Sequence, residues 1–364
     1  MTKTKTIADG VKPTVFVGMS GGVDSSVSAA LLKDAGYNVV GVYMKNWSKD
    51  LPGMKCPWAD DLADAKRVAV KLGIDFKVFD FEKDYKQKVV DYMLEEFKRG
   101  RTPNPDIMCN QEIKFKLFYD VAREQGADFI ATGHYAKNDG KNLLRAVDEN
   151  KDQTYFLYRI SEDAIEHTIF PLGDMLKPDV KKLAEKYGLH NAYKKESMGV
   201  CFVGDVGIRD FLKEYIDEEP GEIRDAETDN VLGYHEGAIF YTIGQRHGLN
   251  VGGGIPYYVV KKDIAKNIVY VSQNLNNKEL WTKSLKLTEM ILRGDVPEIV
   301  FVRLRHRAEL IPAKLKLGND DTAELEFNEE IKAPAAGQSA VIYTGDAKDS
   351  GKARVCAGGG IIAE

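Results

Sequence analysis

The sequence is poor in cysteine, lacks long apolar runs and carries no excess of positive charge. Four cysteines among 364 residues, with no C-x-x-C pair, exclude a disulfide scaffold and argue against a zinc ribbon. No window approaches the ~18 apolar residues of a transmembrane helix, and the first residues lack the apolar segment of a secretory signal. We therefore expect a cytoplasmic protein with reduced thiols and no membrane contact.

The charge balance excludes a globally basic nucleic-acid binder but allows local basic faces. The chain carries 51 Lys and Arg against 56 Asp and Glu, a net charge of −5. Arg303, Arg305 and Arg307 alternate, so within a strand all three would project from one face. Residues 177–195 are also locally basic. Each face is interpreted either as a phosphate-binding surface or as an ordinary solvated face.

Strands and helices alternate through the first part of the chain, up to residue 135. The apolar runs expected to be strands are 15–17, 39–43, 76–79 and 128–132. The helical patterns cover 27–32, 61–72, 85–98 and 113–125. This alternation predicts an α/β domain with a doubly wound parallel sheet, which binds ligands beyond the carboxyl ends of its strands.

The pattern changes from about Gly221 to short apolar runs separated by Gly, Asn and Asp. The strands expected there are 238–243, 257–260, 267–271, 285–287, 300–304, 313–317, 323–327 and 339–343. Evenly spaced short strands predict a small barrel or sandwich. We expect three domains, at residues 1–205, a small β-rich or mixed central domain at 206–280, and a β-barrel at 281–364.

A glycine- and serine-rich turn, Gly18 to Ser26, joins the first strand to the first helix. Its N–H groups and the helix dipole would attract an anion, and Asp24 could hold a metal ion that bridges phosphates. It matches neither G-x-x-x-x-G-K-[ST] nor G-x-G-x-x-G. By itself such a turn is also compatible with a tight turn capped by serine. The full S-G-G-V-D-S string resembles the PP-loop of ATP pyrophosphatases, which cleave ATP between its α and β phosphates.

Cys109 follows the segment R-T-P-N-P-D-I-M, which begins at Arg101. Its two prolines are expected to keep this segment out of a helix and to place Cys109 near the start of a helix at about Ile113. A thiol at a helix N-terminus has a lowered pKa. Asp106 could act as a general base. The alternative is that Cys109 is a small core residue.

The remaining cysteines differ in their surroundings. Cys201 lies between glycines and follows the lysine pair at 194–195, whose charge would favour a thiolate, although a core position is equally compatible with its apolar neighbours. Cys56 lies in a loop and Cys356 precedes a glycine run, and both are interpreted as non-catalytic.

A set of motifs follows in one order along nearly the whole chain. The motifs are G-M-S-G-G-V-D-S-S, G-V-Y-M-K-N-W, G-R-T-P-N-P-D-I-M-C-N, A-T-G-H-Y, K-D-Q-T-Y-F-L, G-V-C-F-V-G, T-I-G-Q-R-H-G-L, P-A-A-G-Q-S-A and G-G-G-I-I. This set and its order resemble those of bacterial tRNA 2-thiouridylases. The resemblance implies ATP-dependent 2-thiolation of the wobble uridine, with adenylation of the C2 oxygen and sulfur from a cysteine persulfide. It implies Mg²⁺ with ATP, a persulfide-donor protein, and tRNAs of the glutamate, lysine and glutamine type.

The same resemblance implies roles for individual residues. Cys109 would be the nucleophile, Cys201 the persulfide carrier and Asp106 the acid–base residue. The expected ATP-binding residues are Gly18, Met19, Ser20, Gly21, Gly22, Val23, Asp24, Ser25, Met44 and Gly133, with Asp24 also expected to hold Mg²⁺. The expected tRNA contacts are Asn104, Pro105, His134, Lys151, Asp152, Gln153, Arg305, His306 and Gln338.

Other interpretations remain open. A different PP-loop enzyme, such as a ligase using ammonia or an amino acid, would explain the loop and the sheet but not the two cysteines. Thiolation of another uridine is a further alternative, although such enzymes usually carry additional RNA-binding domains or C-x-x-C pairs. A nucleotide-binding regulator or RNA-binding module would make the cysteines structural, and it would bind ATP without forming AMP.

Overall fold

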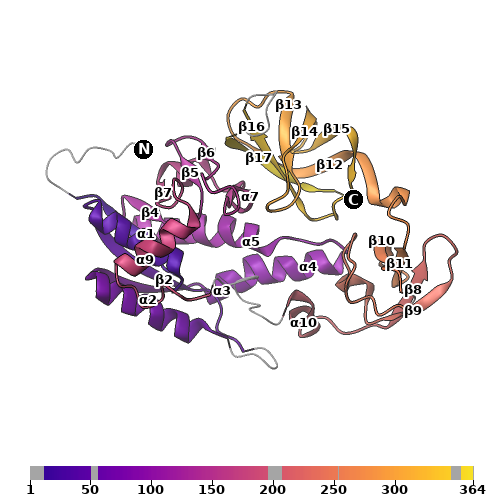
Figure 1. The fold of residues 1–364 in the computed structure, drawn as a ribbon, viewed down its shortest axis with the longest axis horizontal. Helices are drawn as coiled ribbons and strands as arrows, with labels where there is room; N and C mark the ends of the chain where they lie inside the picture. Colours follow the sequence, from indigo (N-terminus) through magenta and orange to yellow (C-terminus); the bar gives the residue numbers. More distant parts are fainter. Residues whose placement is uncertain (1–11, 51–55, 196–206, 253, 346–353, 364) are drawn as a thin grey trace.

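The computed structural model describes residues 12–50, 56–195, 207–252, 254–345 and 354–363. They form three sheets: a five-stranded parallel sheet, a four-stranded sheet and a six-stranded barrel whose last strand is extended by a short hairpin. Figure 1 shows the parallel sheet at one end of the molecule, with the barrel and the four-stranded sheet at the other. Among the described residues, no helix has both the length and the apolar composition needed to cross a bilayer.

The N-terminal sheet is parallel throughout, as predicted. Its strands are β1 (Thr14–Gly18), β2 (Asn38–Lys45), β3 (Asp75–Asp80), β4 (Phe129–Ala131) and β7 (Thr168–Ile169). Their order is β3-β2-β1-β4-β7. The order reverses between β1 and β4, the switch point at which open α/β sheets bind ligands.

Helices cover both faces of this sheet because successive strand residues point to opposite sides. Val15 and Val17 join one apolar cluster, with residues of α1 (Val23–Asp34), α2 (Trp58–Leu72) and α9 (Lys177–Lys186). Phe16 joins the other cluster, which contains the helical segments on either side of the turn at residues 99–104. The doubly wound architecture expected from the sequence is therefore confirmed.

Those two segments are each a helix interrupted by π-helical turns. The first comprises α3 (Glu82–Tyr85), a π-helix at Lys86–Asp91 and α4 (Tyr92–Lys98). The second comprises α5 (Pro105–Met108), a π-helix at Cys109–Leu117 and α6 (Phe118–Glu124). In Figure 1 both extend from the parallel sheet toward the other two domains.

The expected start of the second helical segment is wrong. The segment begins at Pro105 and not near Ile113, so Cys109 lies in its second turn. Asn104 caps this helix, with its Oδ1 accepting from the Asp106 N–H at 3.1 Å and from the Ile107 N–H at 3.4 Å. A proline at the first helical position is favourable because its missing N–H would have no partner there. The second proline therefore starts the helix that it was expected to prevent.

The central sheet has the order β10-β11-β8-β9. Its strands are β8 (Gly221–Asp225), β9 (Val231–His235), β10 (Tyr258–Asp263) and β11 (Ile268–Ser272), preceded by α10 (Ile208–Lys213). The strand expected at 238–243 is wrong, since Ala238–Phe240 form a 3₁₀ turn. Ala238 and Phe240 are nevertheless buried. A short apolar run reports burial without distinguishing a strand from a buried turn.

The C-terminal sheet closes into a barrel because its first and last strands, β12 and β17, pair with each other. Its strands are β12 (Trp281–Leu292), β13 (Ile299–Arg303), β14 (Ile311–Leu317), β15 (Ala323–Lys332), β16 (Ser339–Thr344) and β17 (Val355–Ile362). The hairpin of β5 (Lys137–Asn138) and β6 (Leu143–Leu144) pairs with β17 and so joins the N-terminal domain to the barrel sheet. Two short helices, α7 (Thr154–Leu157) and α8 (Glu162–Glu166), follow this hairpin.

The predicted strand bearing three arginines on one face is wrong. β13 ends at Arg303, whose side chain is buried, while Arg305 and Arg307 are exposed in the following turn. Arg307 has a positive φ of 64°, which breaks the alternation of a strand. The three side chains therefore do not form one basic face.

Candidate functional site

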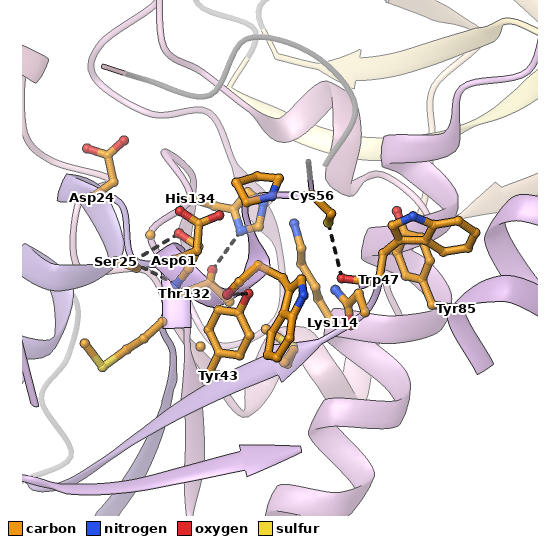
Figure 2. Close-up of a pocket in the computed structure, with 18 of the residues that line it drawn as sticks. Asp24, Ser25, Tyr43, Trp47, Cys56, Asp61, Tyr85, Lys114, Thr132 and His134 are labelled. Carbon is orange, nitrogen blue, oxygen red and sulfur yellow. Dashed lines mark hydrogen bonds between the residues drawn. The ribbon is translucent and has the colours of Figure 1, made fainter. Parts of the chain in front are cut away.

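A pocket opens at the carboxyl ends of β1, β2 and β4, where the strand order reverses. Its volume is about 280 Å³, near the lower end of the ~300–1,000 Å³ range of small-molecule sites. It is lined by Gly18, Met19, Ser20, Asp24, Ser25, Tyr43, Met44, Asn46, Trp47, Cys56, Pro57, Trp58, Asp61, Tyr85, Lys114, Thr132, Gly133, His134 and Gln153. Figure 2 shows Ser25, Asp61, Thr132 and His134 toward one side, with Cys56, Trp47 and Tyr85 toward the other.

The phosphate loop has the geometry of an anion cradle. Ser20 N–H donates to Ser25 Oγ at 3.2 Å, and Gly22 precedes α1 with no side chain capping the helix within the described residues. The N–H groups of the first turn are thus left for a bound anion. Gly21 has φ +75°, and a Cβ there would lie 2.5 Å from the Asp61 carbonyl oxygen. A Cβ on Gly133 would lie 2.7 Å from the Ser25 nitrogen, so both glycines are required by close packing.

Asp24 is paired with a lysine that the sequence analysis missed. Both its carboxylate oxygens accept from Lys177 Nζ at 2.7 Å, and Oδ1 also accepts from Tyr135 Oη at 3.0 Å. Lys177 is only 7% exposed, and its backbone N–H donates to Asp148 Oδ2 at 2.9 Å. Asp24 and Lys177 are 153 residues apart, so no local pattern could reveal the pair. The result is a cation held beside the phosphate loop.

The other part of the pocket is aromatic and contains an unsatisfied acceptor. Tyr43 Oη donates to the Trp58 carbonyl at 3.0 Å, and Lys45 Nζ lies 5.0 Å from the centre of the Trp58 ring. Asn46 Oδ1 is buried and has no hydrogen-bond partner among the described residues. A planar ring with an exocyclic amino group would stack here and donate to that oxygen. An adenine base fits these requirements.

The helix that carries Cys109 also forms part of the pocket wall. Lys114 lines the pocket, and the Phe115 ring lies 5.7 Å from the ring of His134. His134 Nδ1 is 2.8 Å from Thr132 Oγ1. Desolvation, with the charge of Lys114 adding to it, lowers the pKa of His134 well below its ordinary value, so this imidazole is neutral at pH 7. His134 and Gln153, expected as tRNA contacts, therefore line the same pocket as most of the residues expected to bind the nucleotide.

Of the two expected catalytic thiols, Cys109 belongs to the described residues. Cys109 is buried, at 1% exposure, and is not among the residues lining the pocket. Cys201 lies outside the described residues. The cysteine that does line the pocket is Cys56, whose Sγ lies 3.7 Å from the Trp47 carbonyl oxygen and whose pKa is raised by burial. The roles of Cys109, Cys201 and Asp106 stay predictions.

Asp152 joins the N-terminal domain to the barrel. Its side chain is fully buried, and its Oδ2 accepts from Arg303 Nη1 at 2.9 Å and lies 3.6 Å from Arg145 Nε. Ala146 N–H donates to the other carboxylate oxygen at 3.2 Å. A carboxylate enclosed in this way anchors the chain between Lys151 and Gln153, which are half-buried, and is not accessible to a tRNA.

The neighbouring predicted tRNA contacts differ in exposure. Arg305 is exposed, whereas the His306 ring packs on Phe156 with 4.7 Å between centroids. Burial lowers the pKa of His306 to about 4, so it is uncharged at pH 7. Arg307 Nε donates to the Asn150 carbonyl at 2.9 Å. The contact between Arg307 and Asn150 places the turn after β13 beside the loop before Asp152, at the seam between the N-terminal domain and the barrel. At this seam Arg305 is more accessible than His306 and Asp152, and their contacts with tRNA stay predictions.

Gln338 points from the barrel to the segment that precedes the Cys109 helix. Its Nε2 donates to the Thr102 carbonyl at 2.6 Å. Pro105 follows Asn104 at the start of the helix and is buried. Three of the expected tRNA contacts, Asn104, Pro105 and Gln338, therefore lie at or near one structural junction.

Three family models match consecutive parts of the chain. The one described as tRNA methyl transferase HUP domain matches residues 13–205. Those described as tRNA methyl transferase PRC-barrel domain and aminomethyltransferase beta-barrel domain match residues 209–273 and 277–362.

Full-length relatives are similar to nearly the whole chain. A tRNA-specific 2-thiouridylase of Listeria monocytogenes is 45% identical over 96% of this chain and 94% of its own length. The corresponding protein of Idiomarina loihiensis is also 45% identical, over 96% and 95%. Among solved structures, a 4-thiouridine synthetase–RNA complex with bound ATP covers 50% of this chain and 43% of that chain, at 19% identity and a TM-score of 0.35. That structural likeness is too weak to support an inference about substrate.

Proposed function

Because this chain belongs to the tRNA-specific 2-thiouridylase family, and so is a tRNA-modifying sulfurtransferase, we propose that it thiolates C2 of the wobble uridine at the expense of ATP. The observation that carries the proposal is the pocket, in which an anion-binding loop faces an aromatic, hydrogen-bonding wall. We propose residues 1–205 as the catalytic domain, 206–280 as the central tRNA-contacting domain and 281–364 as the barrel domain.

In this proposal the loop Gly18–Ser25 binds the triphosphate and Asn46 accepts from the adenine amino group. The C2 oxygen of uridine attacks the α-phosphorus, pyrophosphate leaves, and the oxygen becomes part of a good leaving group, AMP. N–H groups of the loop and the Lys177 ammonium stabilise the charge that develops on the departing pyrophosphate. A uridine stacked in the anticodon loop has to be flipped out to reach this pocket.

Sulfur enters through the second half of the proposed reaction. A donor protein transfers its terminal sulfur to Cys201, forming a persulfide. Sulfur from this persulfide attacks C2 and AMP leaves with the original oxygen. The Cys109 thiolate then attacks the Cys201 sulfur and forms a disulfide with it, while the bond from that sulfur to the transferred sulfur breaks and its electron pair stays with the sulfur now on C2. An external thiol reductant reduces the Cys109–Cys201 disulfide before the next turnover. Asp106, whose N–H is held by the Asn104 cap, is the proposed acid–base residue.

Magnesium enters the proposal only as a companion of ATP. The site as it stands does not fit an ion held by Asp24, because both carboxylate oxygens accept from Lys177. Within the described residues, no group of three His, Cys, Asp or Glu side chains is placed to hold a metal. In the proposed reaction, the negative charge of the phosphates is therefore balanced by Lys177 and by the N–H groups of the loop, and not by a magnesium ion held by Asp24.

On the tRNA side, the proposal rests on the seam between the domains. Arg305 is exposed and suited to a phosphate, while Lys151 precedes the buried anchor Asp152. The proposed substrates are the glutamate, lysine and glutamine tRNAs, and we propose that the protein acts in the cytoplasm.

The test is nucleoside mass spectrometry of unthiolated glutamate or lysine tRNA after incubation with the protein, Mg-ATP and a persulfide donor. We expect sulfur to replace oxygen on the wobble uridine only when ATP is present. Cys201→Ser should abolish sulfur transfer yet retain tRNA-dependent AMP formation. Cys356→Ser is the matched control and should retain both, because its thiol is buried in the barrel and its pKa is raised to about 11.

Two outcomes would overturn the proposal. AMP release with a small-molecule acceptor, without sulfur transfer, would point to a ligase. Binding of ATP with no AMP formation under any condition would point to a regulator. Normal thiolation by Cys201→Ser would remove the persulfide assignment alone.

A further inference from the structure

The three-residue segment Gly100–Thr102 of the N-terminal domain is held by the central domain and by the barrel. It follows α4 and leads through Pro103 to Asn104, the cap of the helix that carries Cys109. Figure 1 shows the ends of α4 and α5 directed toward the barrel and the four-stranded sheet. Because only Pro103 and Asn104 separate this segment from the first helical residue, Pro105, the position of the segment determines where the helix starts.

The central domain holds the segment through Lys262 of β10. Lys262 Nζ donates to the Gly100 carbonyl and to the Tyr241 carbonyl, both at 2.7 Å. Both acceptors are uncharged, and burial lowers the pKa of Lys262 to about 8. Keeping an ammonium group on two carbonyls has an electrostatic cost that an exposed lysine avoids. Thr242 supports the same contact, with its Oγ1 3.3 Å from Thr102 Oγ1.

The barrel holds Thr102, the last residue of the segment, through the backbone groups of Thr102. Thr102 N–H donates to the Ala336 carbonyl at 2.8 Å, and Gln338 Nε2 donates to the Thr102 carbonyl at 2.6 Å. Gly337 has φ +88°, and a Cβ there would lie 2.9 Å from the Thr102 nitrogen. Both hydrogen-bonding groups of one backbone residue are thus satisfied by residues more than 230 positions away.

We propose that Lys262 and Gln338 are positioning residues that hold segment 100–102 and thereby set the helix bearing Asp106 and Cys109 against the nucleotide pocket. This inference rests on the proposed function for its kinetic consequence. The helix reaches the pocket wall through Lys114, so a displacement at its start moves groups beside the bound nucleotide. Displacement of a reacting group by about 1 Å costs about 100-fold in rate.

The test compares three variants of neighbouring lysines. Lys262→Met removes both donated hydrogen bonds, Lys262→Arg retains donors, and Lys261→Met is the control, since Lys261 is exposed on the same strand. We expect Lys262→Met to lower kcat for thiolation about 10–100-fold with less than a 2-fold change in the KM for tRNA. Lys262→Arg should recover most of the loss, and Lys261→Met should match the wild type.

A second readout does not require activity. Hydrogen exchange of a peptide covering residues 101–112 should become at least 10-fold faster in Lys262→Met while the loop 18–26 remains unchanged. Gln338→Met should reproduce both effects from the barrel side. This measurement separates the inference from the proposed function, because a protein that fails to thiolate tRNA still reports on the segment.

Three results would overturn the inference. One is unchanged exchange at 101–112 in both Lys262→Met and Gln338→Met. Another is a raised KM for tRNA at constant kcat in Gln338→Met, which would make Gln338 a direct tRNA contact. The third is a failure of Lys262→Arg to recover activity although its unfolding temperature is normal, which would show that the carbonyl contacts do not matter.

Discussion

The phosphate loop and the seam between the N-terminal domain and the barrel differ in how far apart their contacting residues lie in the sequence. In the loop, the defining contact joins Ser20 and Ser25, five residues apart, and glycines supply the conformation. At the seam, Arg303 reaches Asp152 over 151 residues and Gln338 reaches Thr102 over 236. A site built from neighbouring residues can be recognised as a motif, whereas a site built across domains exists only once the chain has folded. We therefore expect substitutions at the seam to lower the free energy of unfolding and substitutions at the loop to weaken ATP binding.

The largest expected effect is loss of stability from Asp152→Asn at the seam. The substitution keeps the shape but leaves Arg303 and Arg145, 5% and 4% exposed at their side chains, without a buried counter-charge. Breaking a buried pair costs about 3–5 kcal/mol of unfolding free energy. Chemical denaturation would measure it. The control Glu149→Gln removes the exposed partner of Arg145 and should cost less than about 1 kcal/mol. A loss below about 1 kcal/mol for Asp152→Asn would show that the pair does not stabilise the seam.

A smaller and different effect is expected from Lys177→Met at the loop. Loss of the cation that pairs with Asp24 leaves a negative charge facing the nucleotide phosphates. The Kd for ATP should rise about 10-fold, a change of ~1.4 kcal/mol. Isothermal titration calorimetry measures this binding, and Lys181→Met, an exposed residue of the same helix, is the control. ATP binding that is as tight as in the wild type would remove Lys177 from the phosphate site.

Arg305→Ala should affect only tRNA binding. Arg305 is exposed, so the unfolding free energy should change by no more than about 0.5 kcal/mol. The Kd for tRNA should rise several-fold, and the dependence of its logarithm on the logarithm of salt concentration should fall by about one unit. Filter binding at a series of salt concentrations measures both quantities, with Lys283→Ala on β12 as the control. Equal effects of the two variants would place the tRNA surface elsewhere.

A pH dependence of stability is expected at the seam. His306 binds a proton at about pH 4 in the folded protein and at about pH 6.5 in the unfolded chain. Between these values the unfolded state holds more protons, so this stabilisation is complete above pH 6.5 and declines as the pH falls toward 4. Urea unfolding at pH 7 and pH 5 should show a smaller loss for His306→Gln than for the wild type. An equal loss in both proteins would contradict the lowered pKa.

Prediction from the sequence was most successful where the residues that form a site are neighbours in the sequence. The loop Gly18–Ser25, Met44 and Gly133 were expected around one ligand, and the structure places most of them in one pocket. Reasoning failed where one residue type permits two outcomes. Pro105 was expected to prevent a helix and instead begins one, because its missing N–H needs no partner at that position.

The three alternating arginines show that the position of a charged side chain is also not determined by the local sequence. Arg303, Arg305 and Arg307 were expected on one face, but the strand ends at Arg303, and a buried carboxylate takes that side chain inside. The sequence of residues 301–307 does not indicate that Arg303 pairs with Asp152, which lies 151 positions earlier. The same holds for Lys177, which only the packing of α9 against α1 brings to Asp24.

By itself, the sequence identified the family through the resemblance of its motifs. It also determined the alternation of strands and helices, the glycine-rich loop and the strands of the C-terminal barrel, because periodicity and turn residues act over a few positions. Only the tertiary structure decided that Asp152 is an anchor, that Lys177 pairs with Asp24, and that Lys262 and Gln338 meet at segment 100–102. These contacts join distant residues, whose meeting depends on how whole domains pack. The free energy of burial and pairing selects them, and no local pattern encodes that selection.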